Sequence, residues 1–257
     1  MSRSSKRDIK LPAPYLRRVW LDEERIADKD RYPFCIPLFR DGFEIAFRDP
    51  ITILIGENGV GKSTVIEGIA ALAGFDDAGG GSGYRPVDHS GAREASGGEL
   101  AAALRASWLP KLNTGWFFKA ETFFSVSRYL DAAGSLSADF LSHSHGEGFM
   151  RFFDERCSRQ GVYFFDEPES ALSPARQLQF LKLLRRMEDS NICQVVMATH
   201  SPILMAYPGA RLLRLSKYSV DEVRLEDTDH FRLMREFCAE PETFIASVLA
   251  GNSSWSE

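Results

Sequence analysis

The sequence predicts an α/β fold with a mainly parallel central sheet, flanked by helices, and an antiparallel N-terminal β portion. The main observation is a set of apolar runs of strand length: ITILIG from Ile51, VYFF at 162–165 and CQVVMATH at 193–200. Runs of this kind are typical of strands buried on both faces. Segments with helical spacing separate them, which favours a parallel sheet. Ligands of such sheets gather at the carboxyl ends of the strands, so we expect a functional site there.

The first part of the chain contains short segments punctuated by prolines. FEIAF at 43–47 alternates in polarity, which predicts a half-buried strand. After the strand that begins at Ile51, STVIEGIAALAG has apolar residues at helical spacing, and Gly74 ends that helix. Residues 76–98 are rich in glycine and poor in apolar residues, which predicts a mobile surface loop.

The second half continues the alternation. WFFKA at 116–120 predicts a strand, and helices are expected over 122–132 and from Glu147 to no further than Gly161. Ser173 as N-cap and Pro174 at the first helical position begin a helix to Met187. We expect its core face to include Leu178, Leu181 and Leu184. RLLRL at 211–215 and EVRLE at 222–226 are expected to pair as an exposed hairpin, and the chain from Asp229 to be helical. One domain over 1–257 accounts for all of these elements.

Composition narrows the class of partner and the compartment. The formal net charge is −5, so no positive field over the whole protein indicates nucleic acid. The basic SRSSKR near the N-terminus is interpreted as a solvated tail. The four cysteines stand singly, which favours a reducing cytoplasm over a disulfide or zinc framework. A charged N-terminus without an apolar h-region predicts no signal peptide, and no apolar stretch is long enough to span a bilayer.

The stretch GENGVGKST matches the pattern G-x-x-x-x-G-K-[ST] between a predicted strand and a predicted helix. Glycines let a backbone wrap a phosphate with its N–H groups pointing inward, and the new helix presents its positive end to the same anion. Lys62 is expected to reach the β- and γ-phosphates, and the Ser63 hydroxyl to bind Mg²⁺. The predicted phosphate-binding residues are Gly56, Glu57, Asn58, Gly59, Val60, Gly61, Lys62, Ser63 and Thr64.

Three carboxylates follow the VYFF strand within the stretch FFDEPESALSP. They would repel one another without a cation. A nucleoside triphosphate with Mg²⁺ gives them a role, because Asp166 at the strand end can hold the metal directly or through water. Glu167 is placed to polarise the attacking water as general base. Glu169 is interpreted as a solvated charge at a helix start.

GENGVGKST, YFFDEPESALSP and MATHSP, in this order, resemble the nucleotide-binding domain of ABC-class ATPases, a P-loop NTPase of ABC type. The whole chain looks most similar to stand-alone bacterial ATPases near the SMC, DNA-repair and OLD-like branches of that class. The resemblance implies that His200 is the switch histidine that contacts the γ-phosphate. Only residues 122–143 separate Glu121 from the expected signature, without sustained heptads, so a DNA-bridging coiled-coil arm is not expected.

The resemblance also implies a signature segment that caps the ATP of a partner subunit. Two stretches compete for it, ASGGE at 95–99 and HSHGE at 143–147. The second lies one helix before the acidic strand, so it is chosen: Ser144 would contact the γ-phosphate through its hydroxyl and Gly146 through its N–H, with Glu147 beside them. ASGGE is interpreted as part of the glycine-rich loop.

The chain departs from the class at two positions. Glu121 stands where the class usually has a glutamine that senses Mg²⁺, and it is taken as a metal contact. Ser173 stands where the D-loop usually has aspartate. No adenine-stacking aromatic is assigned, because Tyr15, Tyr32 and Phe43 are each interpreted as core residues.

The resemblance implies Mg²⁺-dependent binding and hydrolysis of ATP in a head-to-tail homodimer that sandwiches two ATP molecules. Such a cycle would act on a partner, DNA or a protein effector, in a DNA-maintenance or defence-type role. Two alternatives stay open: a nucleotide-gated binding module with negligible turnover, and the ATPase subunit of a membrane transporter.

Overall fold

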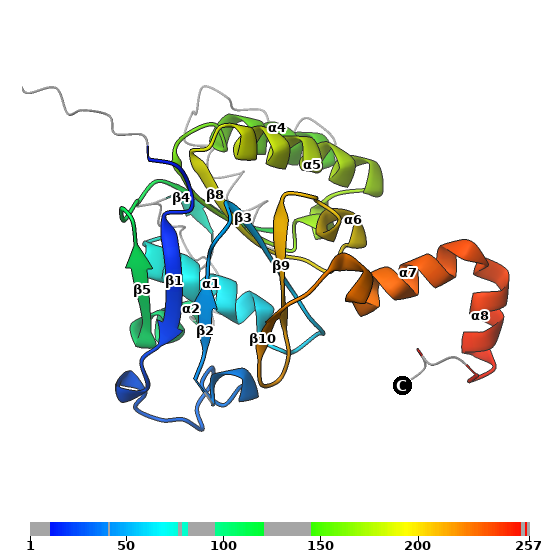
Figure 1. Cartoon of the computed structure of the whole chain (residues 1–257), viewed down its shortest axis with the longest axis horizontal. Helices are drawn as coiled ribbons and strands as arrows, with labels where there is room; N and C mark the ends of the chain where they lie inside the picture. The colour runs from blue at the N-terminus through cyan, green and yellow to red at the C-terminus, as the bar shows by residue number, and fades with distance from the viewer. Residues whose placement is uncertain are drawn as a thin grey trace, which may run out of the picture.

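A seven-stranded sheet runs through the middle of the molecule (Figure 1), seen in a computed structural model that describes residues 11–40, 42–76, 79–81, 96–120, 145–252 and 255. The strand order is β10-β9-β3-β8-β7-β6-β4. Neighbours from β9 to β6 are parallel, and β10 and β4 are antiparallel edge strands. The strands are β3 (Ile51–Ile55), β4 (Gly80–Gly81), β6 (Gly115–Lys119), β7 (Gly161–Asp166), β8 (Cys193–Ala198), β9 (Ala210–Leu215) and β10 (Val220–Glu222). The prediction of a mainly parallel central sheet is confirmed.

A second, antiparallel sheet has the order β2-β1-β5. It consists of β1 (Leu16–Leu21), β2 (Glu44–Ala46) and β5 (Leu104–Trp108). The predicted antiparallel N-terminal portion is therefore present, and FEIAF supplies its strand β2. The third strand, β5, comes from later in the chain and was not expected. Only Leu104 of β5 is buried, and the other four residues are partly or fully exposed, so the sequence shows only a weak strand pattern here.

The helices lie on both faces of the central sheet (Figure 1). They are α1 (Lys62–Ala73), α2 (Ser96–Ala103), α4 (His145–Arg156), α5 (Pro174–Asp189), α6 (Pro202–Met205), α7 (Asp229–Ala239) and α8 (Pro241–Leu249). Short 3-10 turns lie at Glu23–Arg25, Pro37–Phe39, Pro168–Ala171 and Leu225–Asp227. Helices α4 and α5 cover one face, whereas α1 fills the space between the other face and the small sheet.

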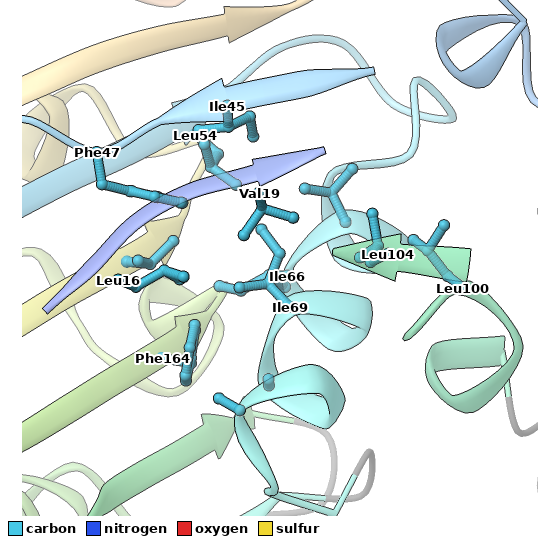
Figure 2. Packing of buried hydrophobic residues seen from close by; sticks show 14 of the residues in the cluster. Leu16, Val19, Ile45, Phe47, Leu54, Ile66, Ile69, Leu100, Leu104 and Phe164 are labelled. Atoms are coloured by element: carbon cyan, nitrogen blue, oxygen red, sulfur yellow. The ribbon is translucent and has the colours of Figure 1, made fainter. Parts of the chain in front are cut away.

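Alternate residues of the central strands enter two separate cores. On the α4–α5 side the core is rich in phenylalanine: Phe118 stacks on Phe165 with ring centroids 4.7 Å apart, and Phe153 and Phe180 pack edge-on against Phe165. On the other side Leu54 and Phe164 pack with α1 and the small sheet, as Figure 2 shows. Both faces of the strands are therefore buried, which is why they read as continuous apolar runs.

One buried amide joins the two sheets. Gln194 of β8 is fully buried. Its Oε1 accepts hydrogen bonds from the backbone N–H groups of Tyr15 (2.9 Å) and Leu16 (2.8 Å), and its Nε2 donates to the Leu16 carbonyl (2.9 Å). The side chain thus satisfies three backbone groups at the start of β1 that would otherwise be buried without partners.

Several expected elements differ in detail from the structure. Helix α5 begins at Pro174 with Ser173 as its N-cap, as predicted, but Leu178 is 55% exposed and does not belong to the core face. The helix phase instead buries Phe180, Leu183, Leu184 and Met187. The second hairpin strand is β10 rather than 222–226, because Leu225 lies in a 3-10 turn.

The glycine-rich segment 76–98 is more ordered where it is described than the loop prediction implied. Gly80 and Gly81 form strand β4 beside β6, and Ser96 begins helix α2, which packs on α1. A methyl group at Gly68 of α1 would lie 2.7 Å from a Leu100 methyl, so the two helices pack closely. The rest of that segment, and the helix predicted over 122–132, lie outside the described residues.

The chain from Asp229 is helical, as predicted, and α7 and α8 extend away from the sheet (Figure 1). Neither contains a buried residue. Among the described helices, none combines the length and apolar character needed to cross a bilayer.

Candidate functional site

The phosphate-loop sequence lies between β3 and α1, at the carboxyl end of the strand. Three glycines of the loop have backbone conformations that other residues adopt with strain: Gly56 has φ 148°, Gly59 has φ 79° and Gly61 has φ 100°. At Gly56 a Cβ would also lie 2.4 Å from the Leu215 carbonyl oxygen. The loop therefore turns sharply beside β9 and enters α1 with its N–H groups free of side-chain capping, because Gly61 as N-cap offers no side-chain acceptor.

Lys62 folds back over this loop. Its Nζ donates hydrogen bonds to the carbonyls of Gly56 (2.9 Å) and Glu57 (3.0 Å), and the residue is only 5% exposed. Burial lowers the pKa of the ammonium group from its ordinary value, and the carboxylates of Glu167 and Glu57 oppose that shift. The ammonium is thus a poorly hydrated cation with weak partners, ready to exchange carbonyls for an anion.

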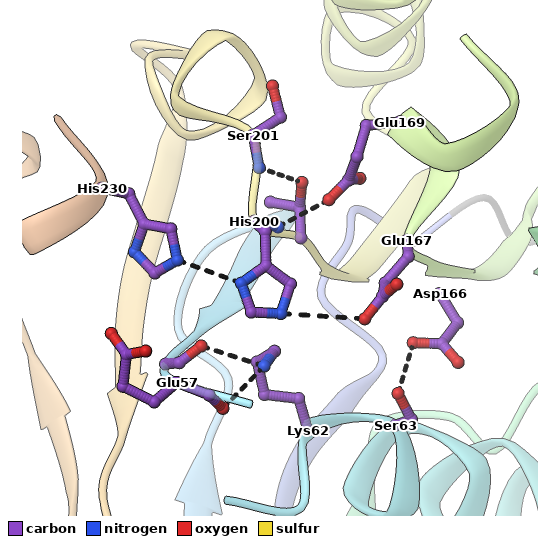
Figure 3. Close-up of polar contacts among 11 residues, drawn as sticks. Glu57, Lys62, Ser63, Asp166, Glu167, Glu169, His200, Ser201 and His230 are labelled. Atoms are coloured by element: carbon purple, nitrogen blue, oxygen red, sulfur yellow. Dashed lines mark hydrogen bonds and ion pairs between the residues drawn. The ribbon is translucent and has the colours of Figure 1, made fainter. Parts of the chain in front are cut away.

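Ser63 and Asp166 meet across the gap between α1 and β7. The Ser63 hydroxyl donates to Asp166 Oδ1 at 3.2 Å (Figure 3). Asp166 is 5% exposed, and burial raises the pKa of its carboxyl group to about 7. The nearby Lys119 ammonium opposes that increase. A carboxylate in this position is stabilised by any additional cation.

Lys119 is a neighbour of this pair that the sequence reasoning did not single out. It lies directly opposite Asp166 in the β6–β7 register, and its Nζ is 2.6 Å from Glu67 Oε1 of α1. No sequence signal singles it out, because Lys119 lies within the predicted strand 116–120, whereas Asp166 directly follows the predicted strand 162–165. This largely buried pair brings one cation and one further carboxylate to the edge of the Ser63–Asp166 gap.

Glu167 follows Asp166 in a left-handed conformation, with φ 47° and ψ 54°. A non-glycine residue in this region costs about 1–3 kcal/mol and is held by its surroundings. Here the Glu167 N–H donates to the Ala198 carbonyl at the end of β8, at 3.0 Å. The turn sends the side chain, 40% exposed, toward His200, whose Nε2 lies 3.8 Å from Glu167 Oε1.

Two hydrogen bonds position His200, one through its backbone and one through its ring. Its backbone N–H donates to Glu169 Oε1 at 2.6 Å, and its Nδ1 is 3.0 Å from Nε2 of His230. Burial, followed by the nearby Lys62 ammonium, lowers the pKa of its imidazole. Glu169 is half-buried, and burial raises the pKa of its carboxyl group. The interpretation of Glu169 as a solvated charge is therefore wrong, because it anchors the backbone of His200.

Together these side chains surround one small space at the carboxyl ends of β3, β7 and β8 (Figure 3). A cation, a hydroxyl–carboxylate pair, an exposed carboxylate and a neutral imidazole face it from Lys62, Ser63–Asp166, Glu167 and His200. The arrangement can bind an anion and, next to it, a hard cation. It also offers a base and a hydrogen-bond donor on the side away from α1.

A magnesium ion fits the donor set. Ser63 Oγ and the Asp166 carboxylate are oxygen ligands, and Mg²⁺ in phosphate-transfer sites takes one or two protein ligands, with phosphate and water oxygens completing the octahedron. Among the described residues no group of three or more histidine, cysteine, aspartate or glutamate side chains is arranged around a metal position. The donor set therefore suits a metal that arrives with a phosphate ligand.

The remaining predicted site residues are less informative. Ser144 and Glu121 lie outside the described residues. Gly146 and Glu147 are in the first turn of α4, and the Glu147 side chain lies outside the described part of the structure. The signature and the glutamate sensor therefore stay predictions. The competing ASGGE stretch supplies the first turn of α2, where Glu99 Oε1 lies 2.5 Å from the Arg31 guanidinium.

The interpretation of Tyr32 as a core residue is wrong. Its ring is 47% exposed, and its hydroxyl is 2.9 Å from Thr64 Oγ1 at the phosphate loop. Tyr15 and Phe43, in contrast, are buried as expected. Tyr32 stands in a proline-rich segment without regular structure, so only its contact with the loop identifies it.

Two family models match separate parts of the chain. The model described as "AAA domain" matches residues 35–105, which contain the phosphate loop. The model described as "AAA domain, putative AbiEii toxin, Type IV TA system" matches residues 141–206, which contain Asp166, Glu167 and His200. Each half of the site thus falls within a segment that resembles AAA domains.

One curated relative and several solved structures are similar to parts of the chain. An OLD nuclease from Thermus scotoductus is 33% identical over 75 residues, which span 29% of this chain and only 14% of the relative. Similar solved structures include the SMC head domain from Thermotoga maritima (15% identity, 82% of this chain, 100% of that chain, TM-score 0.45) and the ATP-binding cassette of an ABC transporter (15%, 90%, 97%, TM-score 0.47). The family matches and the OLD relative confirm the resemblance to ABC-like P-loop ATPase domains near the OLD branch.

Proposed function

We propose that this chain binds Mg²⁺-ATP and hydrolyses it. The observation that carries the proposal is the convergence of Lys62, the Ser63–Asp166 pair, Glu167 and His200 on one space beside the phosphate loop. These groups come from positions up to 138 residues apart (62 to 200), so the fold, rather than sequence proximity, assembles them. Each matches a need of phosphoryl transfer, in which charge on the triphosphate must be neutralised and a water oriented.

Binding begins at the phosphate loop. The free N–H groups at the start of α1 attract the phosphates, and Lys62 exchanges the carbonyls of Gly56 and Glu57 for phosphate oxygens. Because the Lys62 ammonium is buried, its attraction to an anion is weakly screened. Tyr32, exposed beside Thr64, is available to contact the nucleotide at the other end of the loop.

Ser63 Oγ and the Asp166 carboxylate would hold the metal on the opposite side of the phosphates. When bound, Mg²⁺ neutralises charge on the β- and γ-phosphate oxygens. Asp166 then stays ionised, because a bound cation opposes the burial that raises its pKa to about 7. Glu121, outside the described residues, is the proposed second contact.

Glu167 takes the role of general base, and His200 that of phosphate contact. The strained turn at Glu167 directs its carboxylate to the open side of the space, where a water can stand in line with the terminal phosphate. His200 Nε2, 3.8 Å from that carboxylate, is directed to the same region and can donate to a γ-phosphate oxygen.

The proposals on assembly, partner, biological role and compartment rest on the family resemblance and not on the geometry of the site. We propose a head-to-tail homodimer in which Ser144, Gly146 and Glu147 of each protomer close over the ATP of the other. The AbiEii toxin and OLD nuclease names favour a defence or DNA-maintenance role over transport. The partner would be DNA or a protein effector, and the chain would act in the cytoplasm.

The first experiment replaces the base. Glu167→Gln should reduce steady-state ATP turnover at least about 100-fold, because loss of general-base catalysis typically costs 10²–10⁴. ATP affinity, measured by calorimetry with Mg²⁺, should stay within about threefold, since the carboxylate does not bind the phosphates. Glu226→Gln, an exposed acid in the 3-10 turn after β10, is the matched control and should behave like the parent.

Two outcomes would overturn the proposal. A parent protein without turnover but with tight ATP binding supports the alternative of a nucleotide-gated binding module. A Glu167→Gln variant that hydrolyses ATP like the parent shows that another group activates the water.

A further inference from the structure

His200 forms a pair with His230, a residue that neither the motifs nor the proposed function uses. His200 follows β8, and His230 lies in the first turn of α7, 30 residues later. Their closest ring nitrogens, Nδ1 of His200 and Nε2 of His230, are 3.0 Å apart, with ring centroids 5.2 Å apart (Figure 3). At this distance the two nitrogens share one hydrogen, so the state of one ring sets the state of the other.

The two ring nitrogens of His200 face different surroundings. Nδ1 faces His230, whereas Nε2 is buried and has no hydrogen-bond partner within the described part of the chain. The nearest acidic group to Nε2 is the Glu167 carboxylate, at 3.8 Å, which exceeds hydrogen-bonding distance. His230 is therefore the partner that determines which nitrogen of His200 carries the proton.

The Glu167 carboxylate indicates the direction of the shared hydrogen bond. An ionised carboxylate only accepts hydrogen bonds and so favours a proton on Nε2, but at 3.8 Å it makes no hydrogen bond that would hold this tautomer by itself. The neutral tautomer of His200 is therefore assigned a proton on Nε2, and the hydrogen bond with His230 is what fixes it. Nδ1 is then an acceptor, and Nε2–H of His230 is the donor to it.

His230 is itself held in place by its helix. Thr228 is 2% exposed and is the N-cap of α7: its Oγ1 accepts from the Phe231 N–H at 3.3 Å and donates to the Leu225 carbonyl at 2.7 Å. This cap sets where α7 begins, and hence where the His230 ring stands. A hydrogen-bond donor that is fixed in position by its helix can set the orientation of the ring that it contacts.

We propose that His230 is a positioning residue, which fixes the tautomer and orientation of His200 so that Nε2–H is directed between Lys62 and Glu167. The expected effect of His230 on the rate of turnover rests on the proposed ATPase function. Its expected effect on the tautomer of His200 does not. It links helix α7, which extends from the sheet, to the terminal phosphate of the substrate.

The structural arm of the test needs no nucleotide. The chain has five histidines. With ¹⁵N-labelled histidine, long-range ¹H–¹⁵N spectra of the nucleotide-free protein report the tautomer of each ring. His200 of the parent should show Nε2–H. His230→Leu should lose that preference, whereas His230→Gln should keep it, since the Gln Nε2 amide stands near the position of His Nε2 and can donate.

The kinetic arm separates positioning from simple packing. His230→Leu should reduce kcat by about tenfold, the scale of losses on removing an orienting partner, with ATP affinity within about twofold. His230→Gln should recover most of that loss. Met234→Ala, at an exposed position of the same helix, is the control for altered α7 packing and should behave like the parent.

The outcomes are distinguishable. If the parent lacks turnover, the proposed function fails, and the spectra still decide the role of His230. A His230→Leu variant whose His200 keeps the Nε2–H form overturns the inference. So does an equal loss of rate in His230→Leu and His230→Gln, because the glutamine retains the donor.

Discussion

At the scale of single residues, the buried carboxyl group of Asp166 makes the stability of the protein depend on pH. Burial raises its pKa to about 7, well above the ordinary value near 3.8. The protonated form is therefore favoured in the folded state and not in the unfolded state. Its contribution to stability is fully present below the unfolded pKa and is lost as the pH rises through about 7.

We expect the free energy of unfolding of the metal-free protein to fall by about 1.4 kcal/mol between about pH 6 and about pH 8 through Asp166 alone. Asp166→Asn should lack this component, so its pH dependence should be flatter by that amount. Urea unfolding in the presence of a chelator measures both proteins. Identical pH dependence would show that the carboxyl group titrates normally.

Mg²⁺ should stabilise the parent and have little effect on the variant, since only the parent keeps an ionisable ligand.

At the scale of elements, one buried side chain satisfies the backbone groups at the start of β1, where the small sheet meets the central sheet. Gln194 of β8 serves three backbone groups of Tyr15 and Leu16 and is fully buried. No other described contact of this kind links the start of β1 to the central sheet at these groups. The first strand of the small sheet is thus fixed in position by an amide from β8, the strand that precedes His200.

Gln194→Ala should reduce the free energy of unfolding by about 2–4 kcal/mol, because buried N–H groups lose their acceptor and a cavity remains. Gln179→Ala, an exposed glutamine of α5, is the matched control and should change it by less than about 0.5 kcal/mol. Urea denaturation monitored by far-UV circular dichroism measures both. A loss as small as the control's would mean that water replaces the amide.

At the scale of the whole molecule, the proposed dimer would bring two acidic chains together. The formal net charge of −5 disfavours association without a ligand that supplies contacts. In the proposed dimer ATP lies between the phosphate loop of one protomer and the Ser144 segment of the other. Nucleotide binding and dimerisation are then linked by mass action.

Glu167→Gln with Mg²⁺-ATP should therefore shift the mass measured by light scattering from 28.8 kDa to about twice that value, since the trapped nucleotide stabilises the dimer. Lys62→Ala, which loses its phosphate contact, should stay at the monomer mass. A Glu167→Gln protein that binds ATP by calorimetry yet remains monomeric would contradict the sandwich arrangement but not the site.

Much of this architecture could be read from local patterns. The continuous apolar runs identify strands β3, β7 and β8, because burial on both faces leaves no polar alternation. GENGVGKST and the acids after β7 predict the phosphate loop and phosphoryl-transfer chemistry, since their backbone and charge requirements are local. Helix caps at Ser173 and Gly74 also act within one turn, so α5 begins and α1 ends where predicted.

Other features depend on which residues the fold brings together. Strand β5 pairs with β1 across more than 80 residues of sequence, and no local pattern contains that partner. The exposed side of α5 was misjudged at Leu178 because helix phase is set by packing on the sheet. His230, Lys119 and Tyr32 have ordinary local contexts, and they join the site only through contacts with His200, Glu67 and Thr64. The sequence by itself thus determined the residues whose roles depend on neighbours along the chain. Only the tertiary structure decided the roles of residues whose partners are distant in sequence, because the fold alone brings such residues into contact.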